Sequence, residues 1–529
     1  MKIERTRNAG RNLVFGWALK LYQILIPFLM RTAMIYYLGM EYTGLNNLFA
    51  SVLQVLNLAE LGVGSAMIYS MYKPIARDQP RVICALLNLY RTYYRLIGLA
   101  VAVIGLCLTP FIPHLIHGTI PGGMNVYVLY LLNLAATVLS YWLFAYKNSI
   151  LLAHQRVDVI SKVTLLTNTV QYILQFLVLF LFHNYYAFLI LALLSQAATN
   201  LLSAWAADRM YPQYQPEGKL SRKATRRINH RIRDLFTAKV GATIVNSADT
   251  LVISAFLGLT VLAIYTNYYF ILTSITGLIA IIFNACSAGI GNSLVTETKQ
   301  KNFQDLQKFT FLICWIAGFC SCCLLCLYQP FMAIWVGEEM ELGFSAVICF
   351  CLYFYVYEIN QLLNGYKDAA GIWHEDRFRP LVTAGTNLGL NLLLVQVWGI
   401  YGVLLSTVIS TLFVGMPWLL HNLFTVLFDP HQLKGYLKQL LGYALIVLLS
   451  WVVCGWLCSF INPGPWATLI IRLLICCIVP NAIYLLVYHR TAEFGACLIL
   501  VDNLTKNKLQ LRKRLAFLYP EPAENRKEA

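Results

Sequence analysis

Long apolar runs of about twenty residues or more recur along the whole chain, separated by short polar connections. A helical run of that length crosses the roughly 30 Å hydrocarbon core of a bilayer. The runs are continuous rather than alternating, which favours a helical bundle over a β-barrel. We therefore predict an all-α polytopic membrane protein with about fourteen spans. Their approximate limits are 12–37, 44–71, 83–110, 124–147, 160–182, 185–207, 236–257, 262–290, 308–328, 343–367, 380–397, 400–424, 436–460 and 467–488.

The charge of the connections alternates along these spans. Odd-numbered connections, such as 38–43 and 329–342, contain no Lys or Arg, whereas even-numbered ones carry basic residues. Because cytoplasmic loops collect Lys and Arg, the alternation predicts that both termini are cytoplasmic. The first apolar run, Leu13 to Tyr37, is too long for a signal peptide, so we expect the first helix to stay in the membrane.

Two short turns, Leu38-Gly39 and Leu257-Gly258, each join one long apolar run to another. Residues 36–44 and 255–263 match in their pattern around these turns. We interpret the chain as two halves of similar build, joined at its most basic loop, 208–235. That loop could form a basic helix on anionic headgroups, or it could serve only as a topogenic signal.

The composition agrees with a membrane protein, since 59% of the residues are hydrophobic and 12% are charged. A soluble protein carries about 25% charged residues. The net charge of +16 would suggest nucleic acid in a soluble domain. Here cytoplasmic loops explain the charge, and no stretch is long enough for a soluble nucleic-acid-binding domain.

The fifteen cysteines lie almost entirely inside apolar runs, which argues against a secreted disulfide scaffold. Four of them form a local cluster: Cys320, Cys322, Cys323 and Cys326. This run lacks His or carboxylate neighbours, so we expect small apolar thiols there and no metal. Catalytic motifs and a nucleotide-binding P-loop are absent from the sequence, so we expect neither an enzyme nor a bound cofactor.

Polar residues follow helical spacing inside seven of the predicted spans, among them Asn47, Asn387 and Asn391. Each stripe alone has a structural interpretation, because amides bond packed helices and a residue such as Lys20 can snorkel to the interface. Arg31 lies well away from the basic side. Ionisable groups at membrane depth usually face a cavity or a partner. Seven stripes together therefore indicate a shared wet interior, which is typical of a transporter.

A cavity with bases and amides suits an anionic, hydroxyl-rich ligand, because Arg and Lys bind phosphate and amides bind sugar. The candidate substrate-binding residues are Lys20, Arg31, Arg91, Arg95, Gln54, Asn57, Asn246, Gln361 and Asn364. Three carboxylates are candidates for counter-ions to these bases or for an ion-coupling site: Glu60, Asp249 and Glu358.

Three stretches carry a family resemblance: LNLAELGVGSA at 56–66, YSMYKP at 69–74 and the run 246–268. With them the chain resembles, over nearly its whole length, the polysaccharide-transporter branch of the multidrug/oligosaccharidyl-lipid/polysaccharide exporter superfamily. This branch contains the Wzx-type flippases of bacterial capsule and exopolysaccharide pathways. The three stretches are characteristic sequences rather than catalytic signatures, so they indicate the family better than the substrate.

The resemblance implies two six-helix lobes around a central cavity, residues 1–207 and 236–424, as parallel repeats. The basic linker 208–235 would join them, and helices 425–488 and a basic cytoplasmic tail 489–529 would follow. The family moves undecaprenyl-pyrophosphate-linked oligosaccharides across the bacterial plasma membrane, from the inner to the outer leaflet, by alternating access. Implied partners are this lipid-linked substrate, membrane lipids, a polysaccharide polymerase and other assembly proteins. Coupling to a proton, sodium or the membrane potential stays open.

Three other functions remain as alternatives. A lipid II flippase of the same superfamily would share the mechanism and move a different glycan. A drug/cation antiporter would favour an acidic, aromatic cavity, whereas this chain offers at least four bases. A membrane polysaccharide polymerase would carry a long external loop with catalytic Arg or His, and the external connections here are short and free of Arg.

Overall fold

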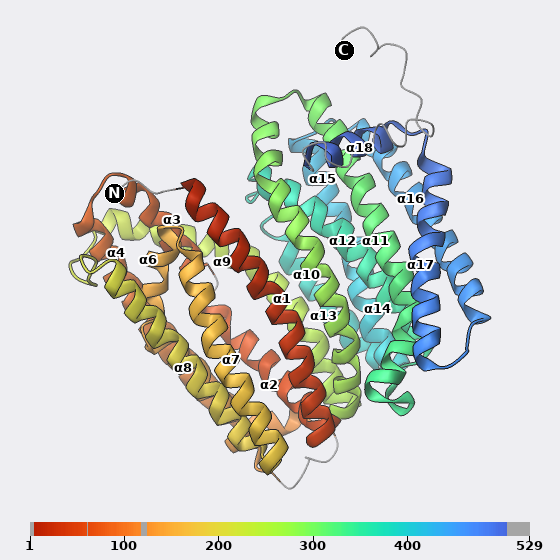
Figure 1. Cartoon of the computed structure of the whole chain (residues 1–529). Coiled ribbons are helices and arrows are strands. Elements are labelled where there is room, and N and C mark those ends of the chain that lie inside the picture. The colour runs from red at the N-terminus through yellow and green to blue at the C-terminus, as the bar shows by residue number, and fades with distance from the viewer. Residues whose placement is uncertain (1–4, 61, 118–123, 505–529) are drawn as a thin grey trace. The chain divides into compact units, whose positions relative to one another are not determined.

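The computed structural model describes residues 5–60, 62–117 and 124–504, which form helices joined by short connections (Figure 1). The helices of the first half are α1 (Arg5–Tyr37), α2 (Met40–Leu56), η1 (Asn57–Glu60), α3 (Val63–Ala76), α4 (Pro80–Leu108), η2 (Thr109–Leu115), α5 (Val126–Trp142), η4 (Ala145–Lys147), α6 (Asn148–Ala153), α7 (Val157–Phe182) and α8 (Tyr185–Met210). Those of the second half are α9 (Arg222–Leu257), α10 (Leu259–Thr296), α11 (Lys299–Val336), η5 (Glu338–Met340), α12 (Phe344–Ala370), α13 (Arg379–Trp398), α14 (Ile400–Ser410), η6 (Thr411–Gly415), α15 (Met416–Val426), α16 (Gln432–Ser459), α17 (Pro465–Tyr488) and α18 (Ala492–Leu504).

Within the described residues, eleven helices are long and apolar enough to cross a membrane. The number rises to twelve if the bent pair Val126–Trp142 and Ala145–Ala153 forms one span. The chain is therefore an all-helical, multi-pass membrane protein, as the sequence predicts. The count of fourteen spans is not confirmed, because the first two predicted spans, 12–37 and 44–71, are not among these helices.

The difference has two causes. The predicted span 44–71 is interrupted, since α2 ends at Leu56 and α3 begins at Val63. Gly62 at this break has a φ of 89°, in the left-handed region that glycine adopts without steric cost. The resulting helices are each shorter than the roughly 20 residues that a span requires. In α1, the side chains of residues 5–19 lie outside the described part of the chain, so the first part of the predicted span 12–37 stays untested.

The two short turns have the same backbone geometry. Gly39 precedes α2 with φ 109° and ψ 168°, and Gly258 joins α9 to α10 with φ 93° and ψ 173°. This part of backbone space is open essentially to glycine alone. The turns that the sequence predicts at both places are present, and each connects two long helices directly.

The basic loop is helical over part of its length. Residues 222–257 form the single helix α9, so the bases from Arg222 to Arg233 extend the apolar part of that helix toward its N-terminus. The guanidinium of Arg231 lies 4.3 Å from the ring centroid of Tyr69 on α3. This stacking ties the basic segment to α3, while its binding to headgroups stays a prediction.

The chain divides into two compact units. Unit 1 comprises Met1–Thr266 and Pro380–Val403, and unit 2 comprises Asn267–Arg379 and Leu404–Ala529. In unit 1, α7 packs along both α1 and α8 (Figure 1). In unit 2, α11 packs against α12, α16 and α17, and α18 also lies on α11. The boundaries of the two lobes, the linker and the tail stay predictions, and residues 505–529 of that tail lie outside the described part of the chain.

Candidate functional site

Arg31 of α1 reaches α10 within unit 1. Its Nη2 donates a hydrogen bond to the hydroxyl of Thr266 at 2.5 Å, and the amide of Asn47 on α2 donates to the same oxygen at 3.0 Å. Thr266 donates its own proton to the carbonyl of Ala263 at 3.0 Å. This bond leaves the lone pairs of the hydroxyl for the two donors, so three helices meet at one oxygen atom.

The carboxylate of Asp249 on α9 lies between α10 and α13, also in unit 1. Its Oδ1 accepts from the amide of Asn391 at 2.7 Å, and its Oδ2 accepts from the hydroxyl of Tyr265 at 3.4 Å. Asn391 also lies 3.4 Å from the amide oxygen of Asn387. All four side chains are buried. A carboxylate inside a membrane protein requires such donors, because it has lost its water.

These contacts form one layer, because Tyr265 and Thr266 are consecutive on α10. We name it the outer polar layer, which comprises Arg31, Asn47, Asp249, Thr266 and Asn391. Each member lies about two helical turns, roughly 11 Å, from the helix end nearest the connections that lack Lys and Arg. The layer therefore lies well inside a hydrocarbon core of roughly 30 Å.

Sequence reasoning named Arg31 and Asp249 but missed Tyr265 and Thr266. The sequence does contain a signal for them. The polar residues 265–267 interrupt the apolar run of α10 shortly after the Gly258 turn. Asn246 lies on α9 one turn before Asp249. Its side chain falls outside the described residues, so its candidate role is untested.

A second polar cluster surrounds the break between α2 and α3. The carboxylate of Glu60 accepts a hydrogen bond from the hydroxyl of Tyr94, which in turn accepts from Tyr90 at 2.8 Å. The amide oxygen of Asn57 accepts from Tyr141 at 2.8 Å. Tyrosines of α4 and α5 thus bond both candidate residues, and no local pattern in the sequence indicates these partners.

The other candidate bases of unit 1 lie apart from the outer polar layer. Arg91 on α4 donates to Asn88 at 2.8 Å, and Asn88 donates to the carbonyl of Gly218 at 2.7 Å in the loop before α9. Arg95 and Gln54 are exposed, and Lys20 is half-buried. Their candidate roles in substrate binding stay predictions.

Glu358 on α12 is the most buried candidate carboxylate of unit 2, with 1% of the residue exposed. Its Oε1 has no hydrogen-bond partner among the described residues. One turn further along α12, Gln361 donates to the hydroxyl of Tyr357 at 2.5 Å. A buried carboxyl with an unpaired oxygen favours the protonated form or a bound cation over a bare charge.

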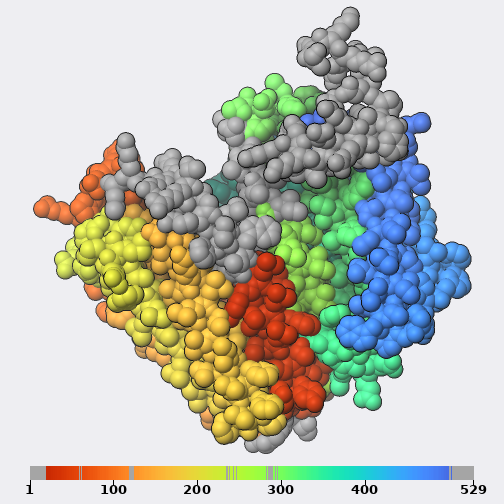
Figure 2. All heavy atoms as spheres, in the orientation of Figure 1, coloured from red at the N-terminus to blue at the C-terminus, as the bar shows by residue number. Residues whose placement is uncertain are grey.

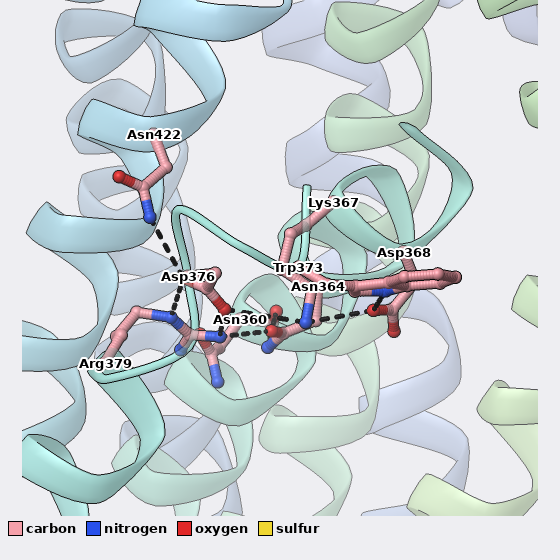
Figure 3. Close-up of polar contacts among 8 residues, drawn as sticks. All are labelled: Asn360, Asn364, Lys367, Asp368, Trp373, Asp376, Arg379 and Asn422. Carbon is pink, nitrogen blue, oxygen red and sulfur yellow. Dashed lines mark hydrogen bonds and ion pairs between the residues drawn. The ribbon is translucent and has the colours of Figure 1, made fainter. Parts of the chain in front are cut away.

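An ionic network lies at the C-terminal end of α12 (Figure 3). Asp376 accepts two hydrogen bonds from Arg379, at 2.6 and 2.7 Å, and one from Asn422 on α15 at 3.1 Å. The ammonium of Lys367 lies 3.5 Å from the same carboxylate. Paired bonds between guanidinium and carboxylate are strong and directional, so this network fixes the connection from α12 to α13.

The candidate Asn364 belongs to this network. Its amide oxygen accepts from Arg379 at 2.7 Å, and its amide nitrogen donates to the carbonyl of Asn360 at 2.8 Å. Both polar groups of the side chain therefore have partners within unit 2. A role of Asn364 in binding substrate stays a prediction, and the structure adds a role in positioning Arg379.

The chain matches a known protein family over much of its length. The family described as "Polysaccharide biosynthesis protein" matches residues 9–288, which is more than half of the chain. No curated protein sequence is significantly similar to the chain.

Solved structures share the fold. The lipid II flippase MurJ in an inward closed conformation has a TM-score of 0.64 at 16% identity, covering 90% of this chain and 99% of its own. A eukaryotic MATE transporter has a TM-score of 0.54 at 11% identity, covering 84% and 99%. A transporter of the MOP superfamily from Pyrococcus furiosus has a TM-score of 0.51 at 14% identity, covering 79% and 94%. The chain therefore has the fold of these transporters.

Proposed function

The chain belongs to the polysaccharide biosynthesis protein family, and on this premise we propose that it is a Wzx-type flippase. In this proposal it moves undecaprenyl-pyrophosphate-linked oligosaccharide repeat units from the inner to the outer leaflet of the bacterial plasma membrane. It does so by alternating access, as a step in capsule or exopolysaccharide biosynthesis. The fold, which is shared with a lipid II flippase, supports a transporter of lipid-linked substrates.

The outer polar layer is the observation that carries this proposal. It places a guanidinium, two amides, a hydroxyl and a carboxylate at membrane depth in unit 1. Arg31 is suited to a phosphate oxygen, because a guanidinium offers charge and two parallel donors. Asn47 and Asn391 carry both donors and acceptors, and in this proposal they exchange their present hydrogen bonds for bonds to sugar hydroxyls. An apolar core has no need of such a set, since each polar group there costs free energy unless it is paired.

One contact of Arg31 is with the neutral hydroxyl of Thr266, and a substrate can compete for this contact. A hydrogen bond to a neutral acceptor is weaker than one to a charged oxygen. The pyrophosphate of a substrate can therefore replace Thr266 as the partner of Arg31 at a net gain. In the empty protein, Thr266 and Asn47 keep the guanidinium in position.

The bases nearer the cytoplasmic end, Lys20, Arg91 and Arg95, provide the first contacts for the anionic headgroup in this proposal. They lie apart from the outer polar layer, so the headgroup moves from these three bases to Arg31. Glu358 is the candidate for coupling to a proton or a cation, since it is buried with an unpaired oxygen among the described residues.

The test is a leaflet assay in the host. The gene is deleted, and lipid-linked oligosaccharide is measured on each side of the plasma membrane with a probe that cannot cross it. We expect the substrate to accumulate on the cytoplasmic side, and we expect the wild-type chain to relieve this accumulation. Arg31→Ala should fail to relieve it, whereas Arg31→Lys, which keeps the charge, should retain part of the activity.

Lys299→Gln is the matched control, because it removes one positive charge from an exposed position at the start of α11. It should relieve the accumulation as well as the wild type does. Full relief by Arg31→Ala would remove the outer polar layer from the mechanism. Unpolymerised repeat units gathering on the outer leaflet after deletion would indicate a polymerase instead and contradict the flippase.

A lipid II flippase is the second candidate, favoured by the shared fold with MurJ over 99% of that protein. The same deletion distinguishes the two functions. Loss of a lipid II flippase would stop peptidoglycan synthesis and block growth, whereas loss of an oligosaccharide flippase would remove the surface polysaccharide from growing cells.

A further inference from the structure

Five buried cysteines meet where α11, α16 and α17 pack together in unit 2. Two come from α11 and two from α16, in each case one helical turn apart, and the fifth comes from α17. They are Cys322 and Cys326, Cys454 and Cys458, and Cys476. In the sequence the cysteines of α11 form a cluster by themselves. The fold adds the thiols of α16 and α17 to them.

Three of these thiols have the geometry of a metal site. The sulfur atoms of Cys326, Cys458 and Cys476 all lie within 4.8 Å of one another, and all three residues are buried. Three thiolates around one ion, each at about 2.3 Å from it, lie roughly 4 Å apart. A small rotation of the side chains closes the difference. The ligands come from three different helices, so one ion would join all three.

A cation lies beside these thiols. Nη1 of Arg472 on α17 donates to the carbonyl of Cys326 at 3.4 Å, and its Nη2 donates to the carbonyl of Ile461 at 3.2 Å. Its Nε is buried without a hydrogen-bond partner among the described residues. A nearby guanidinium favours the thiolate, which is the form that binds a metal. The unpaired Nε indicates that a negative charge at this place would be stabilised.

An open groove borders two of the three thiols. It has a volume of about 740 Å³. Cys326, Cys458 and Arg472 line it together with Trp451 and Trp456. In the space-filling view α16 and α17, in blue, form a continuous face of unit 2 (Figure 2). Two of the three proposed ligands, Cys326 and Cys458, thus border open space.

We propose that Cys326, Cys458 and Cys476 form a three-thiolate site for a closed-shell, thiophilic divalent cation of the zinc and cadmium class. Thiolate ligands select soft ions. The charges favour a dication, because one dication, three thiolates and the Arg472 guanidinium sum to zero. Binding converts three thiols to thiolates and releases three protons. The fourth position of the ion faces the groove.

The inference goes beyond transport of a lipid-linked substrate and gives α16 and α17 a role of their own. One ion holds these two helices against α11, and its binding free energy adds to the stability of unit 2.

Cadmium alone is the probe. The full-length chain is purified in detergent with a reductant that does not bind metal, freed of metal by chelation and titrated with Cd²⁺. Thiolate-to-cadmium charge-transfer absorption in the ultraviolet reports binding. We expect the absorption to saturate at one ion per chain and the thermal midpoint to rise with Cd²⁺. Cys326→Ser, Cys458→Ser and Cys476→Ser should each remove the saturating band.

Cys477→Ser is the matched control, since Cys477 is adjacent to Cys476 but exposed. It should leave the band unchanged. Arg472→Gln should keep the band but weaken binding on the order of 10-fold, because it alters the surroundings of the ligands and not the ligands themselves.

The wild-type titration decides the proposal even if a variant fails to fold. An absent band, binding that does not saturate, or a band that survives all three ligand substitutions would overturn it. Loss of free thiols without metal would also overturn it, since it would indicate a disulfide in place of an ion site.

Discussion

At the scale of single residues, the structure distinguishes buried polar groups that have partners from those that lack them. Asp249 receives hydrogen bonds from Asn391 and Tyr265, whereas Glu358 keeps one oxygen unpaired among the described residues. The sequence marks both as carboxylates at membrane depth. Only the packing of α9, α10 and α13 shows that Asp249 has neutral donors around it.

Glu358→Gln should uncouple transport from the driving ion. The amide cannot bind or release a proton, so we expect the rate of flipping to lose its dependence on the proton or cation gradient. The loss at full gradient should be on the order of 10-fold, the size of a typical coupling between two sites. Flipping in proteoliposomes with and without an imposed gradient measures it.

The matched control for this substitution is Glu339→Gln, in the exposed connection between α11 and α12. It should leave the gradient dependence unchanged. Equal gradient dependence of the wild type and Glu358→Gln would assign the coupling to another residue.

His154 should make stability depend on pH. It lies in the connection between α6 and α7, stacked 4.2 Å from the ring of Tyr211, and its Nδ1 contacts the carbonyl of Ile150 at 2.9 Å. Burial lowers the pKa of the imidazole below its usual value. The unfolded chain therefore binds a proton below about pH 6.5 that the folded chain resists, so the free energy of unfolding should fall as the pH decreases below that value.

Thermal midpoints of the wild type and of His154→Phe between pH 8 and pH 5 test this effect. Phenylalanine retains an aromatic ring for the stacking but does not titrate. The wild type should lose more stability than the variant on acidification. Parallel curves would show that the imidazole does not contribute.

At the scale of elements, the helices of the second half follow the predicted spans closely, because their apolar runs are long and uninterrupted. The break between α2 and α3 was not predicted. Gly62 and Gly64 occur in an otherwise apolar stretch, and no local signal distinguishes a glycine that breaks a helix from one that allows close packing. The structure shows both kinds.

Gly44 is of the second kind. A Cβ added at this position on α2 would lie 2.2 Å from the carbonyl oxygen of Leu259, at the start of α10. The helix pair joined at Gly39 and the helix pair joined at Gly258 therefore contact each other backbone to backbone within unit 1. Since backbone cannot rotate away as a side chain can, any larger residue must move the helices apart.

Gly44→Ala should lower stability by about 1–3 kcal/mol through overpacking. Replacement of a helical glycine by alanine usually stabilises a protein by about 0.4–1 kcal/mol. A loss of stability in Gly44→Ala would therefore be due to the close contact with Leu259. Gly442→Ala on α16 is the control, since a Cβ there meets nothing within 4 Å. Denaturation of both variants in the same detergent gives the comparison, and a stabilising effect of Gly44→Ala would contradict the contact.

At the scale of the whole molecule, composition and hydropathy were sufficient to predict a helical, multi-pass membrane protein. The characteristic stretches at 56–66 and 246–268 indicated the family that the match to residues 9–288 confirms. The partners of the candidate site residues could not be predicted. Arg31 and Thr266 are 235 residues apart, and no periodicity in one helix specifies which helix packs against it.

The alternating charges predict an orientation in the membrane that can be tested directly. A cysteine in place of Glu339, between α11 and α12, should react with an impermeant maleimide on intact cells. A cysteine in place of Gln300, at the start of α11, should react only after the cells are opened. The unsubstituted chain provides the background. Equal labelling of both positions on intact cells would contradict the predicted topology.

The Gly39 and Gly258 turns also bear on the order in which the protein assembles during synthesis. Each turn joins helices that are neighbours in the chain, so each hairpin can form as soon as its second helix emerges from the ribosome. Asn391 follows Asp249 by 142 residues, so the hydrogen bond between them cannot form until α13 has been synthesised. We therefore expect the outer polar layer to be completed late, so that a nascent chain crosses the membrane several times before it can hold a substrate.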